Sequence, residues 1–170
     1  MSIEDVIGFR VADGMLFPLV PRAPGTTAVR AMYVSEDIWA LLSTTHDDEE
    51  LEDRLGMLQA DLELFAEGQP VDPKYLFLLS PLRDSVWEIR SVRPEPSMRV
   101  MCLFAKKDVL IATNVALREN LGGWESKAWK EAKRLARARW TVLFHTHLPL
   151  AFTKVADLVT GAANGKYFKN

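Results

Sequence analysis

Residues 86–115 read VWEIRSVRPEPSMRVMCLFAKKDVLIATNV, and this stretch decides the fold. It contains three apolar runs, Val86–Val92, Met98–Ala105 and Val109–Val115. The breaks between them, Arg93–Pro96 and Lys106–Asp108, have the length of hairpin turns. The stretch therefore predicts three consecutive strands that pair antiparallel, as a meander.

On the N-terminal side of the meander, residues 47–67 have the spacing of an amphipathic helix. Apolar residues recur there every three or four positions and form one stripe: Leu51, Leu55, Leu58, Leu62 and Phe65. The acidic run at 47–50 suits the positive end of a helix dipole, and Gly68 ends the helix. Before it we expect a short strand at 28–34 and a helix at 36–42, with Ser35 as its N-cap.

On the C-terminal side, residues 124–140 predict a helix that follows Gly122 and Gly123. Trp129, Ala132, Ala136 and Trp140 fall on one side of it. Trp124, Trp129 and Trp140 could stack on bases, but their helical spacing favours core packing. From residue 28 the order is strand, helix, long helix, meander, helix, without βαβ alternation. We therefore expect an α+β fold, with helices on one face of an antiparallel sheet.

The two ends of the chain are interpreted as additions to a domain over 28–140. Two apolar runs, 6–11 and 15–20, flank Asp13-Gly14, which predicts an N-terminal hairpin within 1–27. Prolines and a glycine then indicate a linker over 21–27. Residues 141–170 are expected to form a C-terminal tail with a strand-like run and a helix at 152–159.

Composition limits the class of protein. The chain has 170 residues, of which 48% are apolar and 26% charged, as in an ordinary globular protein with a single core. Its apolar runs are too short to cross a bilayer, and Glu4 and Asp5 stand where a secretory signal would be basic. Cys102, the only cysteine, excludes an internal disulfide and is expected to be a buried thiol. We expect a cytoplasmic protein without membrane contact.

The charged residues that give the net charge of -2 are unevenly distributed along the chain. Residues 1–82 carry 5 basic and 15 acidic side chains, a net charge of -10, whereas residues 83–140 carry 13 and 7, a net charge of +6. Such a division is consistent with a surface that faces a polyanion such as RNA. It is equally consistent with acidic and basic surfaces that neutralise each other or are solvated.

The long helix, Leu82, the run Val86–Arg90, then Met98–Val100, a further apolar strand and a basic helix together resemble the RelE/ParE toxin superfamily. The similarity covers residues 28–140 and is greatest to HigB-type, phage-derived members. It implies a toxin that cleaves mRNA in the ribosome without a metal or other cofactor. It also implies a small cognate antitoxin protein as partner.

Arg90 and Arg99 match the strand arginines of the family and are the first candidates for catalysis. Adjacent antiparallel strands would place both on one sheet face, where guanidinium groups can hold a phosphate and stabilise its transition-state charge. The alternative is a structural salt bridge with Glu88, Glu95 or an acidic helix residue. The family's Phe-x-Lys-Lys motif is absent from Asn114–Arg118, where Arg118 is the candidate substitute.

Further basic residues complete the candidate RNA surface. Lys127, Lys130, Arg134 and Arg137 lie along one side of the predicted C-terminal helix, and they either contact RNA phosphates or form a solvated face. Lys106 and Lys107, with Lys127, are candidates to replace the missing lysine pair.

His145 and His147 are the candidate proton-transfer groups, because residues two apart on a strand share a face. No metal-ligand pattern or glycine-rich phosphate loop accompanies them, so no metal or nucleotide cofactor is expected. Two functions stay open. One is ribosome-dependent mRNA cleavage, and the other is a phage or mobile-element protein that binds RNA or a protein partner through its basic face without cleaving.

Overall fold

The predicted meander forms the centre of a six-stranded sheet in the computed structural model, which describes residues 1–161. Strands β4 (Trp87–Ser91), β5 (Met98–Lys106) and β6 (Val109–Leu117) pair antiparallel, as predicted. Asp108 takes a left-handed backbone conformation, with φ 63°, in the turn between β5 and β6. The strand order is β1-β2-β6-β5-β4-β3.

The sheet is mixed rather than purely antiparallel. Strand β2 (Ala31–Ser35) pairs parallel with β6, so the antiparallel expectation is wrong at this position. The short strands β1 (Leu16–Pro18) and β3 (Leu76–Leu78) pair antiparallel at the two edges. The fold is α+β, with a mixed, mostly antiparallel sheet.

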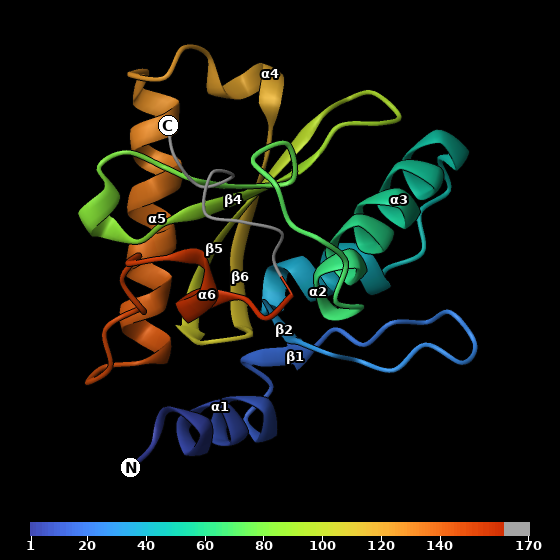
Figure 1. Cartoon of the computed structure of the whole chain (residues 1–170). Helices are drawn as coiled ribbons and strands as arrows, with labels where there is room; N and C mark the ends of the chain where they lie inside the picture. Colours follow the sequence, from blue (N-terminus) through green and yellow to red (C-terminus); the bar gives the residue numbers. More distant parts are fainter. Residues whose placement is uncertain (162–170) are drawn as a thin grey trace.

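Helices α2 (Glu36–Ser43) and α3 (Glu49–Ala66) cover one face of the sheet (Figure 1). The Asp48 side chain caps α3 by accepting from the backbone N–H groups of Glu50 and Leu51. The predicted stripe is confirmed: Leu55, Leu58, Leu62 and Phe65 are buried, and Leu51 packs at the edge of this core.

The opposite face carries α5 (Lys127–Leu143) and α1 (Ile3–Ala12), so the expectation of helices on one face only is wrong. The reason lies in β5, which is apolar at successive positions. Val100, Cys102 and Phe104 belong to the core under α3, whereas Met101 and Leu103 belong to the core under α5. A strand that is apolar on both faces requires a cover on each.

The N-terminal hairpin prediction is wrong, because residues 3–12 form α1 instead of a strand. Ser2 and Asp5 form a capping box in which each side chain accepts from the other residue's backbone N–H. The helix ends before Gly14, which has φ 72°, and the chain then enters β1. Strand β1 pairs with β2 and so extends the main sheet.

The C-terminal segment packs against the sheet. The backbone N–H of Leu150 donates to the Phe104 carbonyl, and Leu158 and Val159 are buried in the core under α3. The predicted helix is shorter, α6 (Val155–Leu158), and residues 162–170 of the predicted tail lie outside the described residues. The short elements η1 (Leu82–Asp84) and α4 (Arg118–Leu121) flank the meander. No helix in residues 1–161 has the length and hydropathy needed to span a membrane.

Candidate functional site

Arg90 and Arg99 lie directly opposite each other on β4 and β5. Glu88 precedes Arg90 by two positions and therefore points to the same face of the sheet, the one covered by α5. Both arginines contact it: Arg90 Nε lies 2.7 Å from Glu88 Oε1, and Arg99 Nε lies 3.5 Å from Glu88 Oε2. The register of the meander thus assembles two cations around one carboxylate.

Glu88 is fully buried, while the two arginine side chains stay partly exposed, at 23% for Arg90 and 13% for Arg99. Burial raises the pKa of Glu88, and hydrogen bonding to Arg90 and the charge of Arg99 offset part of that effect. The salt-bridge alternative with Glu88 is therefore present in the structure. This salt bridge uses only part of each guanidinium group, because the contact to Glu88 is made by Nε. The terminal nitrogens Nη1 and Nη2 can form other contacts.

The remaining contacts fix the two guanidinium groups differently. Arg99 Nη1 donates to the Ser97 hydroxyl at 2.8 Å and to the Met98 carbonyl at 3.1 Å. Arg90 Nη1 and Nη2 have no hydrogen-bond partner among residues 1–161, and the Arg90 guanidinium lies 4.6 Å from the centre of the Phe77 ring. Arg90 is the more accessible of the two cations and is oriented by an aromatic ring.

Arg118, at the start of α4, is the third cation of the cluster. Its Nη1 donates to the Gly122 carbonyl at 3.0 Å, and its guanidinium lies 6.0 Å from the centre of the Trp129 ring. Its charge acts on both Glu88 and Arg99. We call Arg90, Arg99 and Arg118 the arginine cluster; with Glu88 it has a net charge of +2, which suits an anion.

Aromatic side chains connect these arginines, and the sequence pattern did not indicate that connection. Phe77 lies 6.0 Å from Trp124, which stacks on Trp129 at 4.9 Å with 17° between the ring planes. Trp129 is buried, as expected. Trp124 is 52% exposed and lies in the loop before α5, so the expectation that it packs in the core as part of that helix is wrong. Its position directly after two glycines indicates a loop and was the available signal.

His145 and His147 lie in and just after the turn that follows α5 and do not form the expected strand. His147 Nε2 lies 3.1 Å from the Met1 carbonyl oxygen, close to the N-terminus. The arginine cluster is near the opposite end of α5, which is roughly 25 Å long at about 1.5 Å per residue. The structure therefore does not bring either histidine to the arginine cluster.

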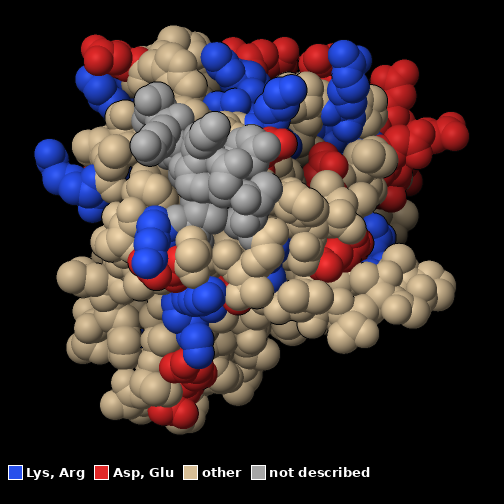
Figure 2. Space-filling view, viewed as in Figure 1, with Lys and Arg blue, Asp and Glu red and all other residues tan. Residues whose placement is uncertain are grey.

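Three of the predicted RNA-binding residues form ion pairs instead of standing free. Lys106 pairs with Glu4, Arg134 with Glu131 and Arg137 with Asp84. Lys107 is exposed in the β5–β6 turn, where the sheet contacts α1, and Lys127 and Lys130 are exposed near the start of α5. Figure 2 shows basic side chains interspersed with acidic ones, and a group of acidic residues near α3. The basic residues do not form one continuous RNA surface on this face.

Cys102 is fully buried in the core under α3, as expected, and burial raises the pKa of its thiol well above the ordinary value. In the described part of the chain, no three His, Cys, Asp or Glu side chains lie together in a way that would hold a metal ion. Neither observation adds a group to the arginine cluster.

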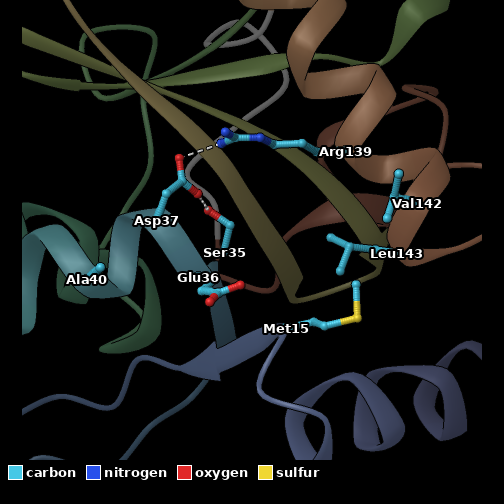
Figure 3. A pocket seen from close by; sticks show the side chains of 8 residues that line it. All are labelled: Met15, Ser35, Glu36, Asp37, Ala40, Arg139, Val142 and Leu143. Atoms are coloured by element: carbon cyan, nitrogen blue, oxygen red, sulfur yellow. Dashed lines mark hydrogen bonds and ion pairs between the residues drawn. The ribbon is translucent and has the colours of Figure 1, made fainter.

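A separate pocket lies where β2 and α2 meet the C-terminal half of α5 (Figure 3). Arg139 Nη1 donates to Asp37 Oδ2 at 2.6 Å and also to the Thr113 carbonyl, and the Ser35 hydroxyl lies 2.6 Å from Asp37 Oδ1. Met15, Val142 and Leu143 supply the apolar wall. Because its polar side chains largely satisfy one another, this pocket is a contact between α2 and α5 rather than an open binding site.

Comparison with known proteins adds no assignment for this site. No family model matches the chain, and neither curated proteins nor solved structures provide a match.

Proposed function

We propose that the arginine cluster binds the phosphodiester backbone of RNA, and that the chain acts as a toxin of the RelE/ParE type on mRNA in the ribosome. The observation that carries the proposal is the cross-strand pair of Arg90 and Arg99, held by one buried carboxylate. A pair of partly exposed guanidinium groups suits a phosphate because each group offers planar, permanently charged donors.

In the cleavage that the proposal implies, the ribose 2′-hydroxyl gives its proton to water and its oxygen attacks the adjacent phosphorus, which forms a 2′,3′-cyclic phosphate. The bond from phosphorus to the 5′-oxygen breaks, and that oxygen takes a proton from water and leaves as a hydroxyl. The phosphorane that forms carries additional negative charge on its equatorial oxygens. Arg90 and Arg99 would stabilise that charge and align the phosphate, with Arg118 as a supplementary cation. Glu88 is a positioning residue in this scheme, because its carboxylate is buried and its Oε1 accepts a hydrogen bond from Arg90 Nε.

The second candidate function is RNA binding without cleavage. It is favoured by the distance of His145 and His147 from the cluster, which leaves the proposed reaction without a proton-transfer group from those positions. It is also favoured by the absence of the lysine pair from Asn114–Arg118. Both functions use the same arginine cluster and differ only in the fate of the RNA.

The test compares wild type, Arg90→Gln and Arg99→Gln in growing bacteria. Arg22→Gln is the matched control, since Arg22 pairs with Glu63 on α3, on the other face of the sheet. The toxin proposal predicts growth arrest and new cut sites within translated frames for wild type and control. Both effects should disappear in the two cluster variants, which should retain the wild-type circular dichroism spectrum.

The outcomes separate the candidates. Arrest without new cut sites, together with RNA binding that requires Arg90 and Arg99, would replace cleavage by binding. Unchanged cut sites in both cluster variants would refute the proposed site. A cognate antitoxin, which the resemblance implies, is tested by co-expressing the small protein encoded beside the toxin and measuring recovery of growth and co-purification.

A further inference from the structure

A cleft adjoins the arginine cluster, between the chain after β3 and the loop before α5. It has a volume of about 770 Å³. Its lining is apolar and aromatic with a few charged groups: Phe77, Leu79, Ser80, Pro81, Trp124, Glu125, Lys130 and Lys133. This combination is typical of sites that bind a flat, partly polar ligand.

Trp124 is the main feature of the cleft. Trp124 is 52% exposed and therefore offers a large flat apolar surface to a ligand. Its ring is held in place by stacking on the buried Trp129, at 4.9 Å between centroids. Because the ring is already oriented, a ligand that stacks on it loses little side-chain entropy.

Phe77 connects the cleft to the arginine cluster. The same ring lines the cleft, lies 6.0 Å from Trp124 and is in contact with the Arg90 guanidinium at 4.6 Å. A group bound at Arg90 and a group bound beside Trp124 are therefore neighbours, separated by one aromatic ring. In a nucleotide chain, a phosphate group and the neighbouring base likewise lie close together, so one strand could occupy both positions.

The charges of the cleft also favour a polyanion. Lys130 and Lys133 line it, and only one donor of Lys133 is used within the described chain, in a 2.7 Å bond to the Ser80 carbonyl. Among residues 1–161, Glu125 is the one acidic side chain of the lining. Aromatic rings with flanking cations are the usual means of holding unpaired bases, since every base has a face that can stack.

We propose that this cleft is a subsite for one unpaired RNA base, stacked on Trp124, next to the phosphate held by Arg90 and Arg99. The inference rests on the proposed function, because it assigns the bound phosphate to RNA. It adds that the substrate is single-stranded at this nucleotide, since a base inside a duplex is not free to stack on a side chain.

The experiment measures the affinity of a fluorescently labelled eight-nucleotide single strand of 2′-O-methyl RNA, which lacks the 2′-hydroxyl needed for cleavage. A second strand of the same length carries abasic residues throughout and so keeps the phosphates without the bases. The proteins are wild type, Trp124→Ala, Trp124→Phe and Arg90→Gln. Met57→Ala is the matched control, an exposed apolar residue on α3.

Trp124→Ala should weaken binding of the strand with bases about tenfold, the effect of losing one base stack, and leave the abasic strand unchanged. Trp124→Phe should recover most of the loss, because a phenyl ring still stacks. Arg90→Gln should weaken binding of both strands, and Met57→Ala of neither.

Each other outcome has a defined meaning. If Trp124→Ala weakens both strands equally, or neither, the base subsite is refuted while the arginine cluster stands through Arg90→Gln. If Arg90→Gln has no effect but Trp124→Ala is selective for the strand with bases, the phosphate site is refuted and the base subsite stands. Absence of measurable binding of either strand to wild type overturns both.

Discussion

Arg54 connects α3 to the meander, and replacing it by methionine tests whether this connection stabilises the fold. The side chain is 2% exposed. Its Nε donates to the Pro96 carbonyl at 2.7 Å, and its Nη2 donates to the carbonyl and hydroxyl of Ser91 at 2.7 and 2.8 Å. The Ser91 hydroxyl in turn donates to Asp61, so Ser91 connects the buried Arg54 to a half-buried carboxylate.

The expected loss follows from these contacts. Removing one member of a buried charged network typically costs about 3–5 kcal/mol, because the groups left behind are neither hydrated nor paired. Methionine fills much of the space of the arginine stem. We therefore expect Arg54→Met to lower the free energy of unfolding by about 3 kcal/mol, the lower end of this range. The pKa of Asp61, which burial raises and the charge of Arg54 lowers, should rise further in this variant.

Urea unfolding followed by circular dichroism measures the free energy of unfolding, with Lys74→Met as an exposed control expected within about 0.5 kcal/mol of wild type. In an Asp61→Asn background the cost of Arg54→Met should fall by about 1 kcal/mol, because the asparagine amide carries no charge that loses its partner. A loss below about 1 kcal/mol for Arg54→Met, at an unchanged urea dependence, would refute the reasoning. Strict additivity with Asp61→Asn would refute the coupling through Ser91.

Three other predictions concern single elements. Trp87→Ala should cost about 3–5 kcal/mol, because the ring is fully buried and packs edge-on against Phe104; a thermal melt like that of wild type would contradict this. Burial raises the pKa of Glu88, so the folded chain binds its proton more tightly than the unfolded chain. The free energy of unfolding of wild type, measured relative to Glu88→Gln, should therefore fall as pH rises from the ordinary glutamate pKa to the raised one. Urea unfolding between pH 4 and pH 8 measures this difference. A difference that does not change with pH would contradict the burial of Glu88. Ser126→Ala should cost about 1 kcal/mol, since the hydroxyl accepts from the Trp129 backbone N–H at the start of α5, and Ser126→Asp should recover part of it in the same melt.

Several parts of the fold were predictable because they depend on neighbours in the sequence. The three strands of the meander follow from short breaks between apolar runs, and α3 and α5 follow from apolar residues that recur with helical spacing. The N-terminal segment shows the limit of such patterns. There the Asp13-Gly14 turn signal suggested a hairpin, while the capping box of Ser2 and Asp5 starts a helix.

The candidate site was predictable only in part. Arg90 and Arg99 could be placed opposite each other from the meander, since pairing along a hairpin is set by the turn. Phe77 and Trp124 could not be connected to them, because they come from separate segments that the fold brings together. His145 and His147 were expected to assist the arginines, but α5 separates the two groups along its length.

The sequence by itself determined which segments are strands and helices in the meander, α3 and α5, because hydrophobic spacing and short turns act within a few residues. Only the tertiary structure decided that β2 lies parallel to β6, that helices cover both faces, and that Glu88 is buried between two arginines. These features depend on contacts between residues far apart in the chain. Their free energy comes from burying surfaces that no local pattern can pair in advance.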